Sequence, residues 1–85
     1  MKEFQYTIQD PMGFHARPAG ALVRAAKAYA SNVTISCGEK SAQLTRLMAV
    51  MGLGIKQGQT VTVTIDGPDE DKAFAELQVQ FRENA

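Results

Sequence analysis

The stretch Thr60-Val61-Thr62-Val63-Thr64-Ile65 places threonine and a β-branched apolar residue at alternate positions. Successive side chains of a strand point to opposite faces, so this stretch predicts a β-strand with one apolar and one polar face. Such a strand needs hydrophobic cover on one side only. The remaining elements have to supply that cover.

Two earlier stretches show the same alternation. Residues 4–8 alternate apolar with polar side chains up to Asp10-Pro11, which ends the strand. Residues 33–37 alternate in the same way, and Cys37 falls on their apolar side. We therefore expect Cys37 to be a buried core thiol rather than a nucleophile. A glycine-containing turn after Cys37 predicts a short third strand of the chain over residues 40–44.

Three stretches have the three- and four-residue apolar spacing of helices with a single apolar face. The first runs from about Ala16 to Tyr29, a short one spans Leu44 to Met51, and the third follows the turn at residues 66–69. We expect Thr45 to cap the middle helix and Asp69 to cap the last. The apolar face of the last helix consists of Ala73, Phe74, Leu77 and Phe81.

The element order is therefore βαββαβα, with no internal repeat or linker. A chain of 85 residues suffices for one small core, so we expect a single domain over residues 1–85. Four strands and three helices with one apolar face each predict an α+β sandwich, in which the helices cover one side of an antiparallel sheet.

The composition excludes several classes of function. Nine Lys and Arg balance nine Asp and Glu, which gives no electrostatic basis for nucleic-acid binding, and no aromatic strand motif is present for stacking on RNA bases. One Cys and one His predict neither a disulfide nor a metal site. The apolar run Leu47 to Ile55 is too short for a membrane helix. We expect a cytoplasmic protein without metal or cofactor, whose partners are proteins.

The only histidine lies in the stretch Gly13-Phe14-His15-Ala16-Arg17-Pro18-Ala19-Gly20, where the first helical pattern begins. Pro18 suits a first helical turn, in which backbone N–H groups lack partners and an anion is favoured. The Ala16 and Arg17 amides and the Arg17 guanidinium would surround a phosphoryl group on the His15 ring. The simpler interpretation is that His15 is an ordinary surface residue.

The run Gly-Phe-His-Ala-Arg-Pro-Ala resembles the active-site signature of HPr, the histidine-containing phosphocarrier family of the bacterial sugar phosphotransferase system. The segment Leu47 to Gly54 is similar to the second helix and following loop of that family. The resemblance implies that His15 takes a phosphoryl group from enzyme I and passes it to enzyme IIA domains, and that Arg17 neutralises the phosphate. It implies a carrier rather than an enzyme.

The same resemblance implies an open-faced β-sandwich with strand order 1-4-2-3, phosphorylation at Nδ1 and a monomer. Because the phosphoryl group must be released readily, we expect the His15 ring to be exposed. A small-molecule enzyme is disfavoured because the chain has no evident second catalytic group. The remaining alternative is a regulatory relative, acting in a nitrogen-related branch or by docking to another protein.

Leu47, Met48 and Met51 share one face of the short helix. This face either packs into the core or forms an adaptable binding patch, since thioether side chains repack against different partners. The resemblance favours partner binding, because the family docks its partners through this helix and the first one.

On the first helix, Ala16 and Gly20 lack bulk and would let a partner approach His15. Arg24 and Lys27 would add cationic contacts to an acidic partner, or would be part of a solvated helix face. Arg46 stands where many regulated members of the family have a serine that a kinase phosphorylates. We therefore expect that layer of regulation to be absent.

Overall fold

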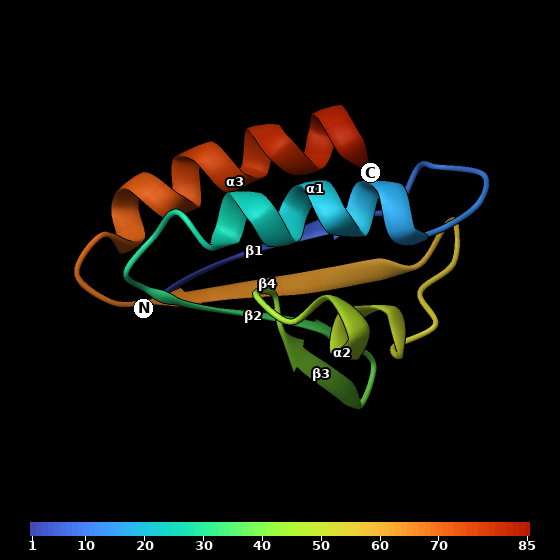
Figure 1. Ribbon diagram of the computed structural model, residues 1–85, viewed down its shortest axis with the longest axis horizontal. Helices are drawn as coiled ribbons and strands as arrows, with labels where there is room; N and C mark the ends of the chain where they lie inside the picture. The colour runs from blue at the N-terminus through green and yellow to red at the C-terminus, as the bar shows by residue number, and fades with distance from the viewer.

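The computed structural model describes residues 1–85, and its elements occur in the predicted order (Figure 1). The strands are β1 (Lys2–Thr7), β2 (Asn32–Cys37), β3 (Lys40–Gln43) and β4 (Thr60–Asp66). The helices are α1 (Ala16–Ala26), α2 (Leu47–Met51) and α3 (Glu70–Asn84). All strand pairs are antiparallel and the order is β1-β4-β2-β3, which confirms the predicted α+β architecture.

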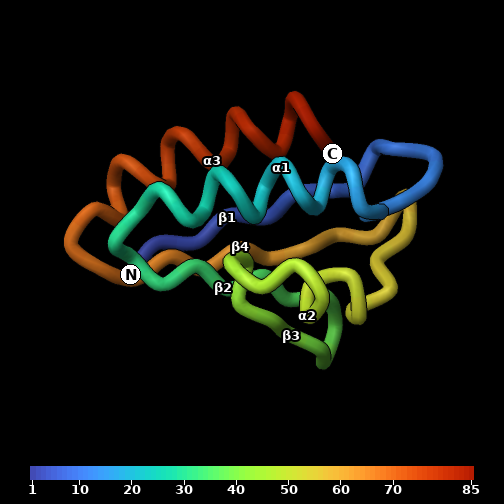
Figure 2. The backbone as a smooth tube through the Cα atoms, in the orientation of Figure 1, coloured from blue at the N-terminus to red at the C-terminus, as the bar shows by residue number.

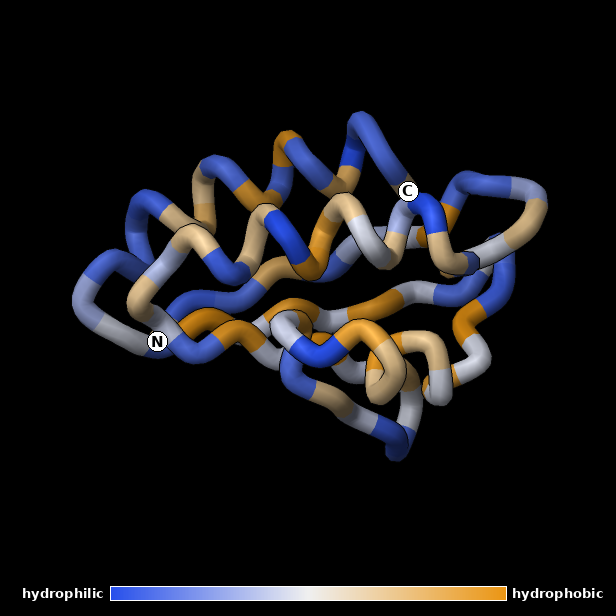
Figure 3. Tube along the Cα trace, viewed as in Figure 1, coloured by the Kyte–Doolittle hydropathy of each residue, from blue (hydrophilic) through white to orange (hydrophobic).

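The central strand β4 has the two faces that its alternation predicts. Val61, Val63 and Ile65 are completely buried, whereas the threonines between them are partly or fully exposed. Val63 lies opposite Phe4 of β1 and Ile35 of β2, so the apolar positions of neighbouring strands are in register. Hydrophobic residues recur along these strands in Figure 3. The sheet therefore has one core face and one polar face.

Helices α1 and α3 run side by side over the apolar face of the sheet, and α2 lies beside β3 (Figures 1 and 2). Each helix buries its own apolar residues in one common core, which includes Leu22, Val50 and Leu77. No helix has the length and hydrophobicity that crossing a membrane would require.

Both shorter helices differ from their predicted limits. Helix α1 ends at Ala26 instead of Tyr29, because the Ala28 and Tyr29 amides bond to carbonyls three residues back, which closes the helix in a tighter turn. Helix α2 starts at Leu47, since Leu44 lies in the turn that follows β3 and its amide donates to the carbonyl of Val33 at 2.8 Å.

The prediction that Cys37 is a buried core residue is only partly confirmed. Cys37 packs against the core from the end of β2, on the apolar side of the strand as predicted. It is half-buried rather than fully buried, because it lies at the turn between two strands at the margin of the sheet.

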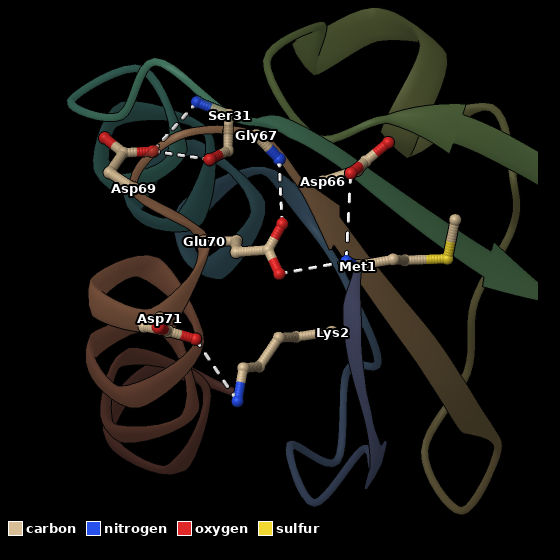
Figure 4. A network of polar contacts seen from close by, with 8 residues as sticks. All are labelled: Met1, Lys2, Ser31, Asp66, Gly67, Asp69, Glu70 and Asp71. Atoms are coloured by element: carbon tan, nitrogen blue, oxygen red, sulfur yellow. Dashed lines mark hydrogen bonds and ion pairs between the residues drawn. The ribbon is translucent and has the colours of Figure 1, made fainter.

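The cap prediction is wrong for Thr45 and only partly right for Asp69. Arg46, not Thr45, occupies the N-cap position of α2, and no side chain caps that helix. Asp69 does occupy the N-cap position of α3 but makes no capping bond. Its carboxylate instead accepts hydrogen bonds from the Ser31 amide and hydroxyl (Figure 4). It also accepts one from the Ala30 amide. Asp69 thus fastens the loop after α1 to the start of α3.

The end of the molecule shown in Figure 4 also holds a group of ion pairs. The amino group of Met1 lies 2.9 Å from Glu70 Oε2, and Lys2 Nζ lies 3.2 Å from Asp71 Oδ1. The Glu70 and Asp71 carboxylates stand in the first turn of α3, where the helix dipole favours them. This acidic end lies at the opposite end of the sheet from the loop that carries His15.

We predict that Asp69→Asn weakens the fold at neutral pH and reduces its sensitivity to acid. The Ser31 hydroxyl first, and then the Ala30 and Ser31 amides, lower the pKa of Asp69. A lowered carboxyl pKa contributes stability above its unfolded value, about 3.9, and that contribution is lost as pH falls through the folded value.

The measurement is urea unfolding of both proteins from pH 7 to pH 2. The free-energy difference between them should shrink as the pH falls below about 4. Glu39→Gln is the matched control, because Glu39 is exposed and makes no ion pair. A difference that stays constant over this range would contradict the assigned role of the carboxylate charge.

Candidate functional site

His15 is the N-cap residue of α1. Its backbone is extended, with φ −87° and ψ −175°, and its carbonyl accepts the first helical hydrogen bond, from the Ala19 amide at 3.0 Å. Pro18 lies in the first turn and has no N–H to satisfy. The Ala16 and Arg17 amides precede the first possible helical acceptor, so they remain available to a ligand. This is the arrangement that the sequence predicts.

The loop in front of His15 is held from two sides. The Gly13 amide donates to the carbonyl of Asp10 at 2.8 Å, and the Phe14 amide donates to the carbonyl of Ile55 at 3.0 Å. The Phe14 side chain is buried in the core. These contacts fix the path of the chain into α1, so His15 lies between the buried Phe14 and the first turn of the helix.

Asp10 is a site residue for which the sequence pattern predicts no role beyond ending a strand. Its Oδ2 lies 3.3 Å from Nε2 of His15, and its Oδ1 accepts the Met12 amide at 2.9 Å. The Met12 amide first, and then His15 and Arg17, lower the pKa of Asp10. A carboxylate five residues before a histidine, with a Gly13 turn between them, is the one sequence signal that points to this contact.

The His15 ring is less exposed than predicted. Its side chain keeps 32% of its accessible surface, because the Asp10 carboxylate lies against its Nε2 edge. Nδ1 has no hydrogen-bond partner within the protein, so one ring nitrogen is paired and the other is available. The expectation of an exposed ring therefore holds for only part of the imidazole.

Arg17 is exposed and forms no ion pair. It lines a polar hollow of about 340 Å³ between α1 and the end of α3, together with Asp10, Arg24 and Glu83. Two guanidinium groups and two carboxylates thus border the same space. Arg17 remains free to turn toward a phosphoryl group on His15, since no internal carboxylate holds its side chain.

The small residues predicted to admit a partner lie in different environments. Ala16 is exposed, but Gly20 is buried. The Arg24 guanidinium covers Gly20, because its Nη1 lies 3.5 Å from the place that a Cβ would occupy there. Arg24 and Lys27 are themselves exposed and free of ion pairs.

Helix α2 presents its predicted apolar face to solvent. Met48 is 81% exposed, and Leu47 and Met51 are 37% and 36% exposed, while Val50 supplies the core contact of this helix. The alternative that this face packs into the core is therefore wrong. Helices α1 and α2 pack against each other, so this face and the exposed side of α1 form one region, which we call the α1–α2 surface. Arg46, also exposed, borders it without an acidic partner.

Comparison with known proteins gives the same family from a family model and from individual relatives. A family model described as "PTS HPr component phosphorylation site" matches residues 2–83. The chain is 45% identical over 83 residues to the Phosphocarrier protein HPr of Lysinibacillus sphaericus, covering 98% of this chain and 94% of that protein. It is 40% identical over 78 residues to the HPr of Mycoplasma capricolum, covering 92% and 88% of the two chains.

Solved structures agree with these sequence relatives. The histidine-containing phosphocarrier protein of Mycoplasma superposes with a TM-score of 0.94 at 36% identity, covering 96% of this chain and 93% of that one. The order of strands and the position of three helices on one face are therefore those of the solved relative.

Proposed function

The chain belongs to the HPr family of phosphocarriers of the phosphotransferase system, and on this premise we propose that His15 is the residue that carries the phosphoryl group. The observation that supports this most directly is the position of His15 as the N-cap of α1, with an unpartnered Nδ1 and two available amides beside it. The proposed cycle uses His15 stoichiometrically, so the protein acts as a carrier and not as a catalyst.

In the proposed reaction, His15 accepts the group from phosphorylated enzyme I and donates it to a histidine on an enzyme IIA domain. Each step is an in-line displacement in which one P–N bond forms as another breaks. The Ala16 and Arg17 amides donate hydrogen bonds to the phosphoryl oxygens, and the Arg17 guanidinium neutralises their charge. A charge-assisted hydrogen bond contributes about 1.5–3 kcal/mol and the helix end about 0.3–1 kcal/mol, so Arg17 is the largest single contributor.

We place partner docking on the α1–α2 surface. Its centre is the exposed apolar face of α2, and the unpaired Arg24 and Lys27 lie at its rim on α1. An apolar centre with charged residues around it is the usual arrangement of a protein interface. The partners named above are cytoplasmic, so the proposed location of this protein is the cytoplasm.

The test is intact mass after incubation with phosphoenolpyruvate and enzyme I, for the wild type and for His15→Ala. We expect one acid-labile phosphoryl group on the wild type and none on the variant. If the wild type takes no group while a known HPr is phosphorylated in the same tube, the carrier proposal fails and a purely docking role remains.

Met48→Ser should weaken binding to enzyme I roughly tenfold, the loss expected when one apolar contact at the centre of an interface is removed. Because the side chain is 81% exposed, the free energy of unfolding should change by less than about 0.5 kcal/mol. Calorimetric titration with enzyme I measures the affinity. Val79→Ser on α3 is the control, since Val79 is also an exposed apolar residue but lies outside the α1–α2 surface. Equal losses for both variants would contradict the proposed location.

A further inference from the structure

We propose that Asp10 is a positioning residue that keeps a proton on Nε2 of His15, so that Nδ1 takes up and releases the phosphoryl group without any proton transfer at the ring. This inference rests on the proposed function of His15. The contact that supports it joins Asp10 Oδ2 to His15 Nε2 at 3.3 Å. A neutral imidazole has one N–H donor and one acceptor nitrogen, and a carboxylate beside Nε2 favours the tautomer with its proton there.

The Asp10 carboxylate is itself fixed in place. Oδ1 accepts the Met12 amide at 2.9 Å, and the backbone carbonyl of Asp10 accepts the Gly13 amide at 2.8 Å. The two carboxylate oxygens therefore differ in role. Oδ1 holds the loop, and Oδ2 faces the His15 ring. The contact of 3.3 Å is long for a hydrogen bond, and contacts of this kind shorten when charge develops on the donor.

Charge develops on the ring when the phosphoryl group arrives. The Nδ1 electron pair forms the new N–P bond, and the N–P bond of the donor breaks with its pair returning to the donor nitrogen. His15 then has phosphorus on Nδ1 and a proton on Nε2, so its ring is an imidazolium. The Asp10 carboxylate stabilises this positive ring, and the protonated ring is the better leaving group for the next transfer. When the N–P bond breaks again, the pair returns to Nδ1 and the proton stays on Nε2.

The charged groups nearest the ring lie on the Asp10 loop, on α1 and at the end of α3, where the carbonyl of Ala85 accepts the Asp10 amide at 3.0 Å. Asp10 lies against its Nε2 edge, and Arg17 follows on α1. Beyond Asp10, the hollow between α1 and α3 holds Arg24 and Glu83. Asp10 is the one carboxylate in contact with His15, whereas Glu83 borders the hollow without touching the ring. Glu83 is therefore a natural control of the same charge.

The experiment compares the wild type with Asp10→Asn and Glu83→Gln. Asparagine keeps an oxygen for the Met12 amide and suits the same turn, so it removes the charge with little change in the loop. Nitrogen-15 NMR of the His15 ring in the unphosphorylated proteins gives the tautomer. The rate of phosphoryl transfer from the phosphorylated proteins to an enzyme IIA domain is measured from pH 6 to pH 9.

We expect a proton on Nε2 in the wild type and in Glu83→Gln, and a mixture of tautomers in Asp10→Asn. Loss of one charge-assisted hydrogen bond should slow transfer by Asp10→Asn roughly tenfold at pH 8. The loss should be smaller at pH 6, where protons are more abundant in solution. A merely structural role for Asp10 would lower the rate equally at every pH and leave the tautomer unchanged.

The role of Asp10 and the carrier function of His15 are refuted by different results. Normal phosphorylation of the wild type, with ring spectra and rates that are the same for Asp10→Asn, would refute the role of Asp10 and leave the carrier function intact. Absence of any phosphoryl group on wild-type His15 would refute the carrier function together with this role.

Discussion

Phe81→Ala should lower the free energy of unfolding by about 3–5 kcal/mol, the cost of removing a buried aromatic ring and leaving a cavity. Phe81 has no accessible surface and lies at the centre of an aromatic cluster. Its ring meets Phe4 and Tyr6 edge-on, at centroid distances of 5.6 and 5.7 Å, and stacks on Phe14 at 6.3 Å. The free energy of unfolding of a protein of this size is only about 5–15 kcal/mol in total, so the variant should be close to unfolding.

Thermal unfolding measures this loss as a fall in melting temperature of roughly 15–30 °C. Phe74→Ala on the same helix is the control. Phe74 is half-buried and contacts only Phe4 in the aromatic cluster, edge-on at 5.9 Å. Its loss should be clearly smaller, and a comparable fall for both variants would show that Phe81 is not the centre of the cluster.

The architecture could be predicted from the sequence because the apolar spacing of each strand and helix indicates both the type of element and its buried side. The alternation in residues 60–65 defines both faces of β4, and residues 73–81 define the buried side of α3. One-sided strands and one-sided helices leave few ways to bury all the apolar faces together. The strand order, by contrast, was predicted from resemblance to HPr, since periodicity contains no information on which strands are neighbours.

Contacts between residues far apart along the chain were not predictable in this way. Asp69 has the residue type and the place of an N-cap, but the Ser31 loop, 38 residues away in sequence, supplies better donors for its carboxylate. Gly20 is small, as predicted, yet Arg24 covers it, because a long side chain one turn later folds back along the helix. Local propensity gives no account of such competition.

Gly13→Ala should cost about 3 kcal/mol or more and should also impair phosphorylation of His15. Two effects add at this position. Gly13 has a φ of +70°, which is strained for any residue with a side chain, and an added Cβ would lie 2.6 Å from the Ile55 carbonyl oxygen and 2.9 Å from the Lys56 Cα. Both neighbours are backbone atoms, so neither can move aside without displacing the loop.

Gly38→Ala separates the two effects. Gly38 has a similar φ of +64°, but a Cβ there would meet nothing within 4 Å. In this variant only the strain of the positive φ should lower the free energy of unfolding, by roughly 1–2 kcal/mol. It should be phosphorylated normally. The excess loss in Gly13→Ala, measured by urea unfolding, is then the cost of the steric clash between the added Cβ and the loop at residues 55–56.

That contact links stability to function at one point. The amide of Phe14, which follows Gly13, donates to the same Ile55 carbonyl, so a shift that relieves the new Cβ also breaks this hydrogen bond. Phe14 would then pull away from Phe81, and His15 would lose the fixed entry into α1 on which its available amides depend. If Gly13→Ala and Gly38→Ala instead lose equal stability and are phosphorylated at equal rates, the close packing at Gly13 has no part in holding the site.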